Sequence, residues 1–298
     1  MAKWTDRYWN SAEGLRLHYR DYEGPRDKPP ILCIPGLTRN ARDFEPVAER
    51  YAGTWRVIAV DLRGRGESEY DPNTRRYSPH YYVADLLKLL DQEGIADAVF
   101  FGTSLGGICT MLFASTDVDR IAGAMLNDIG PEIDSAGVER IGGYVGKETS
   151  FKDWDEAVRK LAERNREIFP CWDQDQWQRF ARRICHETPK GIVFQYDKGI
   201  ADNFRAATET SARDNWNLYR SLAGRPVTIL RGELSDLLSR ETAERMVEAM
   251  DGEAELVVIP DAGHAPTLDE PEALEALDRL LERVMIRQAE QDSGADPA

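Results

Sequence analysis

Residues 100–107 read FFGTSLGG, and this segment carries the strongest signal of the fold. An apolar run leads into the pattern Gly-x-Ser-x-Gly, and residues 108–114 then have the composition of a helix. A serine on such a sharp strand-to-helix turn holds its hydroxyl clear of a sheet, where a substrate can reach it. Side chains at positions 102 and 106 would collide with neighbouring backbone, which explains Gly102 and Gly106. The pattern therefore predicts Ser104 as a nucleophile.

The chain on either side of this stretch alternates strand-like and helix-like segments. Short apolar runs predict strands at residues 15–19, 31–34, 56–60, 98–101, 121–126, 227–230 and 255–259. Continuous apolar runs suit parallel strands buried on both faces, whereas the alternation in residues 15–19 predicts a strand at the sheet edge. Amphipathic spacing predicts helices at residues 81–92, 240–250 and 272–286. This order predicts an α/β fold with a mostly parallel sheet between layers of helices.

One region interrupts the alternation. Residues 131–217 contain helical segments, notably 154–168 and 174–184, but no convincing apolar strand, and they hold four of the seven tryptophans. A connection of this length is too long for one crossover, so a helical cap insertion over the strand ends is predicted. The predicted core domain comprises residues 1–130 and 218–290, and residues 291–298 are expected to be a flexible tail.

A serine needs a general base before it can act as a nucleophile. The chain has only four histidines. His18 precedes the predicted catalytic elements, and His80 and His186 have polar surroundings. His264 follows Gly263 in a loop directly after the last predicted strand, and loops at the carboxyl ends of parallel strands are where such sheets place their sites. His264 is therefore the predicted base.

The histidine in turn needs a carboxylate to hold its tautomer and orientation. Asp236 follows the predicted strand at residues 227–230 and gives the chain order Ser, Asp, His, so it is the predicted acid. Asp128, which follows the predicted strand at residues 121–126, is the main competitor, and Glu233 is a more remote one.

An oxyanion hole requires two hydrogen-bond donors beside the nucleophile. The backbone N–H of Leu105, at the start of the predicted helix, is one candidate. The other is the N–H of Leu37 in residues 34–38, which read IPGLT after an early strand. Residues 61–68 read DLRGRGES and also follow a strand, but they lack the Lys-Ser/Thr ending of a phosphate loop. This loop is expected to support the floor of the site through arginine hydrogen bonds.

Composition limits the classes of partner. The net charge of −15 argues against binding to nucleic acids or anionic membranes, because both repel an acidic surface. The first residues, MAKWTD, show no secretory signal, and the four cysteines lack metal-ligand spacing. The sequence therefore predicts a cytoplasmic enzyme without a metal, with a small-molecule substrate and an oligomeric state that the sequence leaves open.

Taken together, these segments resemble the α/β-hydrolase superfamily, in its capped, cofactor-free branch of carboxylesterases, lactonases and C–C bond hydrolases. The resemblance covers residues 15–286 and rests on residues 35–38, 61–68 and 102–107 with Asp236, Gly263 and His264. It implies an eight-stranded sheet, a helical cap inserted after the sixth strand, and no cofactor. Many relatives carry His-Gly where this chain has Pro35-Gly36. Serine in place of aspartate at position 104 argues against epoxide hydrolase and haloalkane dehalogenase chemistry.

The predicted reaction is hydrolysis of a small or medium carboxylic ester or lactone through an acyl-enzyme on Ser104. The main alternative is cleavage of a carbon–carbon bond in a ring-cleavage diketone, which uses the same fold and triad. A ligand sensor with slow turnover is an alternative of a different class, and a cofactor-free perhydrolase or oxygenase is a weaker one.

Overall fold

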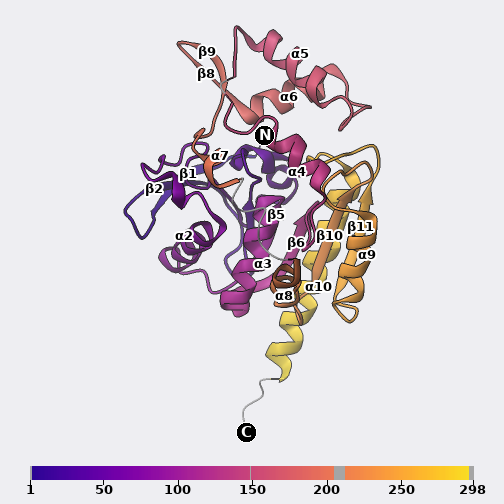
Figure 1. Ribbon diagram of the computed structural model, residues 1–298. Coiled ribbons are helices and arrows are strands. Elements are labelled where there is room, and N and C mark those ends of the chain that lie inside the picture. Colours follow the sequence, from indigo (N-terminus) through magenta and orange to yellow (C-terminus); the bar gives the residue numbers. More distant parts are fainter. Residues whose placement is uncertain (1, 148, 205–211, 295–298) are drawn as a thin grey trace.

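The computed structural model describes residues 2–147, 149–204 and 212–294. Its centre is an eight-stranded sheet with the order β1-β2-β4-β3-β5-β6-β10-β11 (Figure 1). β1 and β2 are antiparallel to each other, β2 is antiparallel to β4, and the remaining pairs are parallel. The strands are β1 (Thr5–Asn10), β2 (Arg16–Tyr22), β3 (Ile31–Ile34), β4 (Val57–Val60), β5 (Ala98–Thr103), β6 (Ile121–Asn127), β10 (Val227–Gly232) and β11 (Ala254–Ile259). The predicted fold class is confirmed.

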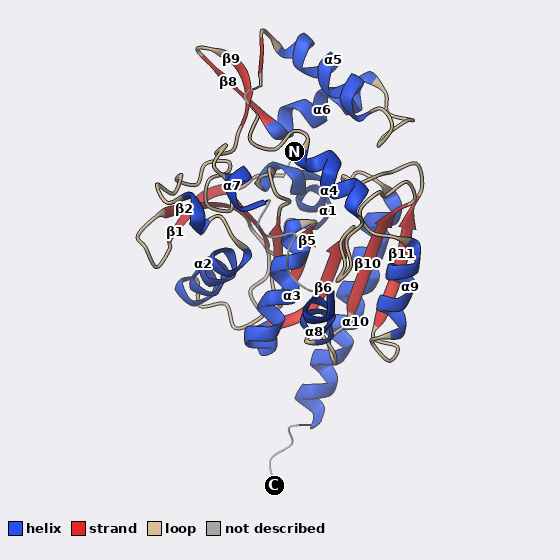
Figure 2. Ribbon diagram, in the orientation of Figure 1, coloured by secondary structure: helices blue, strands red, loops and turns tan. Residues whose placement is uncertain are grey.

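Helices cover both faces of this sheet (Figure 2). One face packs against α2 (Pro79–Gln92), α3 (Leu105–Asp117), α8 (Ala212–Arg220) and α9 (Arg240–Glu248). The other face packs against α1 (Glu45–Tyr51) and α10 (Pro271–Gly294). The central strands β3, β4 and β6 are buried along their whole length, which explains why they read as continuous apolar runs. Short 3₁₀ turns occupy Ala41–Phe44, Thr74–Arg76 and Val118–Arg120.

A small unit lies beyond one end of the sheet, at the top of Figure 1. It contains α5 (Trp154–Asn165), α6 (Gln174–Ile184) and a three-stranded sheet of β7 (Ser150–Phe151), β9 (Gly191–Phe194) and β8 (Cys185–Thr188). We call residues 150–194 the cap segment. Its aromatic centre includes Phe169, which stacks on Trp172 at 3.9 Å. The helices α4 (Ser135–Gly142) and α7 (Ile200–Phe204) flank this unit in the chain.

Several details differ from the sequence prediction. The cap segment contains three short strands, where only helices were expected. The edge strand is β1, and β2, which was predicted at the edge, is its neighbour. No pattern in the sequence indicated β1, because this strand is mostly exposed and has no apolar run. Trp216 lies on α8, which packs against α3 in the core and not within the cap segment. The predicted tail at residues 291–298 begins too early, since α10 continues to Gly294, and residues 295–298 lie outside the described residues.

Candidate active site

Ser104 lies on the sharp turn between β5 and α3. Its backbone has φ of 52° and ψ of −113°, and its N–H donates to the Asn127 carbonyl at 2.9 Å. A β-carbon on Gly106 would lie 2.1 Å from the carbonyl oxygen of Ile34, and one on Gly102 would lie 2.4 Å from the carbonyl carbon of Gly106. Only glycine therefore permits the close approach of helix and strands that holds the serine in this turn.

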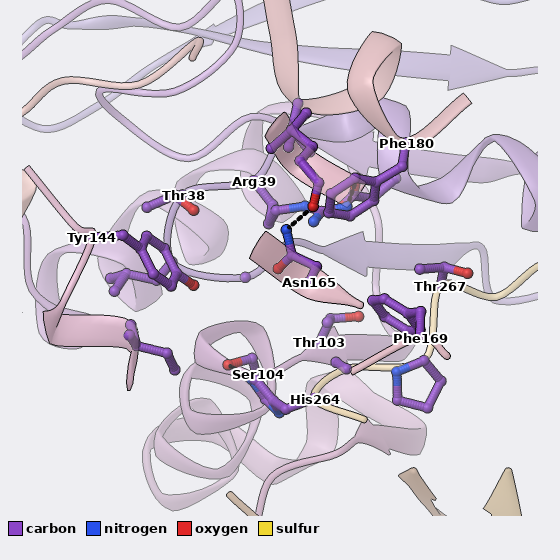
Figure 3. A pocket seen from close by; sticks show the side chains of 18 of the residues that line it. Thr38, Arg39, Thr103, Ser104, Tyr144, Asn165, Phe169, Phe180, His264 and Thr267 are labelled. Carbon is purple, nitrogen blue, oxygen red and sulfur yellow. Dashed lines mark hydrogen bonds and ion pairs between the residues drawn. The ribbon is translucent and has the colours of Figure 1, made fainter. Parts of the chain in front are cut away.

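His264 lies in the loop between β11 and α10, and its side chain reaches Ser104. The Nε2 atom is 2.9 Å from the Ser104 Oγ. The loop also contacts the cap segment, because the Gly263 N–H donates to the Ile168 carbonyl at 2.7 Å. Figure 3 shows His264 and Ser104 side by side at the base of a cavity. The structure thus brings the predicted nucleophile and base within hydrogen-bond distance.

The predicted acid, Asp236, does not contact the histidine, and this part of the prediction is wrong. His264 Nδ1 lies 2.7 Å from Oδ2 of Asp128, the alternative that the sequence left open. Asp236 instead accepts two hydrogen bonds from Arg140, at 2.5 and 2.8 Å. Burial alone would raise the pKa of Asp236, but the Arg140 guanidinium holds it below its usual value. Glu233, the remote alternative, accepts from the Asp261 N–H at 3.2 Å.

Topology explains why Asp128 reaches the histidine. β6 and β10 are adjacent, and Asp128 directly follows β6 with φ of 57°. Its Oδ1 accepts from the Gly232 N–H at 2.9 Å, and its Oδ2 accepts from the Ser235 hydroxyl at 2.7 Å. Because a carboxylate accepts hydrogen bonds, the Nδ1 atom of His264 carries the proton and Nε2 is left to accept from Ser104. The three side chains form the geometry of a Ser-His-Asp triad.

The two predicted oxyanion donors flank the serine, and their role stays a prediction. Leu37 and Leu105 both line cavities that also include Ser104. Neither backbone N–H donates to another residue within the described part of the chain. A β-carbon on Gly36 would lie 3.7 Å from the Ser104 β-carbon, so the turn before Leu37 lies directly beside the nucleophile.

The loop at residues 61–68 supports the turn that carries Leu37. The buried Arg65 donates from Nε to the Leu37 carbonyl at 2.9 Å and from Nη1 to the Tyr82 hydroxyl at 2.9 Å. Asp61 accepts from the Ala41 and Glu67 N–H groups at 2.7 and 2.9 Å. These contacts agree with the expected supporting role.

Two cavities meet at Ser104. The cap cavity lies between the triad and the cap segment, and its walls include His264, Phe169, Phe180 and Tyr144 (Figure 3). The second cavity, which we call the side groove, runs along α3 and α4. Apolar side chains such as Leu105 and Ile108 line it together with polar groups that include His80, Glu132 and Glu241. Leu37 and Ser104 belong to both. A substrate bound at the serine therefore has room on two sides.

Sequence reasoning missed three arginines in the cap cavity, namely Arg39, Arg140 and Arg164. They come from three separate segments and follow no motif, so no local pattern signals them. Among the described residues, no group of three or more His, Cys, Asp or Glu side chains has an arrangement that would hold a metal ion. No described helix is both long and apolar enough to cross a bilayer.

The fold and site geometry define an α/β hydrolase. Residues 31–277 match the model of the alpha/beta hydrolase family, and the chain belongs to this family. The known crystal structure of an α/β hydrolase from Novosphingobium aromaticivorans DSM 12444 is similar, with 51% identity and a TM-score of 0.90 over 95% of this chain and 99% of that chain.

Two relatives that match most of the chain are named as hydrolases. A 3-hydroxybutyrate-oligomer hydrolase of Cupriavidus necator is 33% identical, over 88% of this chain and 91% of its own. A 2-(acetamidomethylene)succinate hydrolase of Mesorhizobium japonicum is 28% identical, over 85% of this chain and 88% of its own. The family match and these relatives identify the chain as a hydrolase.

Proposed function

We propose that this protein hydrolyses a carboxylic ester or lactone through an acyl-enzyme on Ser104. The observation that carries the proposal is the hydrogen-bonded series from Ser104 through His264 to Asp128, at 2.9 and 2.7 Å. A serine hydroxyl is a weak nucleophile until a neighbouring base accepts its proton, and this series supplies that base in a fixed orientation.

In the proposed reaction, Ser104 Oγ attacks the ester carbonyl while His264 Nε2 takes its proton. The negative charge that develops on the carbonyl oxygen is held by the N–H groups of Leu37 and Leu105. His264 then protonates the leaving alcohol, and the acyl group stays on Ser104. Water, deprotonated by the same histidine, attacks the acyl-enzyme and releases the acid. Asp128 orients the imidazole and stabilises its charged form throughout.

One relative supports an ester of modest size as the substrate. The Cupriavidus necator relative is named for hydrolysis of 3-hydroxybutyrate oligomers, whose units are joined by ester bonds. The side groove along α3 carries the apolar side chains of Ile108 and Met111, which suit a short or medium acyl chain. We therefore infer small or medium acyl groups, in preference to polymers or long lipids.

The test is hydrolysis of p-nitrophenyl esters with acyl chains of increasing length, by wild type, Ser104→Ala and His264→Ala. We expect turnover by wild type and a loss of at least about 10³-fold in kcat in both variants, because members of a triad act as a unit. The preferred chain length measures the acyl site. Retention of most activity in Ser104→Ala would contradict the assignment of the nucleophile.

The same experiment separates the alternatives. A folded wild type that hydrolyses no ester would contradict the esterase function and favour carbon–carbon bond cleavage in a ring-cleavage diketone, which an assay with such diketones would detect. Tight binding of a ligand with near-zero turnover would instead indicate a sensor built on the same triad.

A further inference from the structure

Three guanidinium groups surround the cap cavity, and the proposed reaction uses none of them. Arg39 follows β3, Arg140 lies on α4 and Arg164 lies on α5, so three separate elements supply them. The chain as a whole has a net charge of −15, and acidic residues outnumber basic ones by 53 to 38. Three positively charged side chains therefore lie beside the nucleophile in a chain that is acidic overall.

Two of these arginines are held in place with one edge left open. Arg39 donates from Nε and Nη2 to Asp43, both at 2.7 Å, and its guanidinium lies over the Phe180 ring at 4.7 Å. Arg140 donates from the same two atoms to Asp236. In each case Nη1 has no hydrogen-bond partner among the described residues. A guanidinium fixed along one edge presents its remaining N–H groups at little cost in side-chain entropy.

Arg164 differs because it has no carboxylate partner in the described part of the chain. Its guanidinium lies over the Tyr144 ring, 4.5 Å from the ring centre. Three carboxylates lie around the arginines, namely Asp43, Asp236 and Glu163, and each already pairs with an arginine other than Arg164. Arg164 is exposed at the wall of the cavity, and no ion pair joins it to a carboxylate among the described residues.

Tyr144 lines the same cavity as the three arginines. Figure 3 shows its hydroxyl directed into the cavity. Burial raises the pKa of Tyr144, while the charges of Arg140, Arg39 and Arg164 oppose that rise. The phenol therefore stays protonated at neutral pH and is available as a neutral hydrogen-bond donor beside the guanidinium groups.

The position of His264 indicates which part of an ester faces this wall. His264 lines the cap cavity, whereas Leu105 lines the side groove. The leaving alcohol must lie within reach of His264 Nε2 to receive its proton. The alcohol part of the substrate therefore extends into the cap cavity, and the acyl part extends into the side groove along Leu105 and Ile108.

We propose that the alcohol part of the substrate carries a carboxylate, which Arg164 binds together with Arg39, Arg140 and the Tyr144 hydroxyl. The substrate class is then an ester of a hydroxy acid with its acid group free. Guanidinium groups bind carboxylates strongly because two N–H groups match two oxygens. This assignment rests on the proposed ester hydrolysis and adds the group that positions the substrate.

The test compares two substrates that differ only in charge, 3-butanoyloxybutanoate and 3-butanoyloxybutanamide, by measuring the butanoate that both release. We expect wild type to favour the carboxylate by about tenfold or more in kcat/KM, mainly through a lower KM, as a charge-assisted contact would provide. In Arg164→Gln the preference should fall to about threefold or less, and Arg164→Lys should retain part of it. Arg159→Gln, on the outer side of α5 and paired with Glu163, is the matched control and should retain the wild-type preference.

The outcomes are distinguishable. Hydrolysis of neither substrate, nor of p-nitrophenyl butanoate, would contradict the proposed function itself. Equal kcat/KM for the acid and the amide would leave the esterase intact and overturn the inference. An equal loss of kcat/KM on both substrates in Arg164→Gln would also overturn the inference, since that result assigns Arg164 a purely structural role. A preference for a carboxylate in the acyl part, measured with p-nitrophenyl hemisuccinate against p-nitrophenyl butanoate, would overturn the assignment of the two sides.

Discussion

The carboxylate of Asp128 is fixed by three donors, which belong to Gly232, Ser235 and His264. The side chain is fully buried, so water does not compete for these contacts. Because Gly232 ends β10 and Ser235 lies in the turn after it, the carboxylate position depends on this part of the chain as well as on β6. Asp128 and Ser235 together orient the imidazole, which in turn determines where the Ser104 proton goes.

This geometry predicts different effects for the two aspartates near the site. In Asp128→Asn the amide presents an N–H group where His264 requires an acceptor, so the imidazole loses its correct tautomer. We expect kcat on p-nitrophenyl butanoate to fall by about 10³- to 10⁴-fold. Asp236→Asn should lower kcat by less than about tenfold, because it removes only a partly exposed ion pair with Arg140.

Circular dichroism and the melting temperature of both variants provide the control for folding. Equal losses in kcat in two folded variants would contradict the assignment of Asp128 as the orienting acid. A larger loss in Asp236→Asn would return that role to the residue that the sequence favoured.

The choice between these two aspartates shows a limit of sequence reasoning. Both follow apolar strands, and both give the chain order Ser, Asp, His. The distinguishing facts are the left-handed backbone of Asp128 and the capture of Asp236 by Arg140, which lies 96 residues away in the chain. Ser104 and His264 were predictable because the glycines and the position after a strand are local signals. The contact between Arg140 and Asp236 has no such signal.

At the scale of elements, His18 connects β1, β2 and the loop after β4. Its Nδ1 lies 2.7 Å from Asp61, and its Nε2 lies 3.0 Å from Asp6. Burial alone would lower the pKa of His18, but hydrogen bonds and charge from Asp61 and Asp6 outweigh burial and raise it. The imidazole is thus charged over a wider pH range in the folded protein than in the unfolded chain.

This shift predicts a pH-dependent contribution to stability. A raised pKa in the folded state means that the contribution is complete below the unfolded value of about 6.5 and is lost as pH rises through the folded value. The difference in free energy of unfolding between wild type and His18→Gln, measured with urea, should therefore be larger at pH 6 than at pH 9. His80→Gln, at an exposed position on α2, is the control for loss of a histidine. A difference that stays constant or grows with pH would contradict this account.

The elements themselves were predictable to different degrees. Buried strands such as β3 and β6 read as apolar runs because both of their faces are covered. β8 and β9 are half-exposed and four residues long, and they exist because they pair with each other in the cap segment. Such pairing depends on tertiary context and leaves little local signal. The predicted cap insertion extended to residue 217 and so wrongly included most of α8. The amphipathic pattern of α8 shows that one of its faces is buried, but it does not show which part of the protein buries that face.

At the scale of the whole molecule, the cap segment is joined to the core through Arg183 at the end of α6. Its side chain is 8% exposed and pairs with Asp269, at 2.6 and 2.9 Å. The Arg183 carbonyl also accepts hydrogen bonds from Asn40 and Arg42, both at 2.9 Å. The loop of His264 makes a further contact through Gly263. The cap segment, which forms a wall of the cap cavity, is therefore bonded both to the core and to the loop that carries His264.

Loss of this ion pair should loosen the cap segment before it affects the sheet. Arg183→Gln leaves Asp269 without its partner, at a local cost of about 2 kcal/mol, which corresponds to a rise of roughly 30-fold in the population of open forms. Hydrogen exchange should accelerate in residues 174–194 while amides of β5 and β10 keep their protection, and KM should rise because Phe180 and Ile184 line the cavity. Arg159→Gln removes an exposed ion pair of the same cap segment and should leave exchange unchanged. Equal acceleration of exchange in the cap segment and in the sheet would mean that the two open as one unit. The contacts of Arg183 would then not regulate substrate access independently of global unfolding.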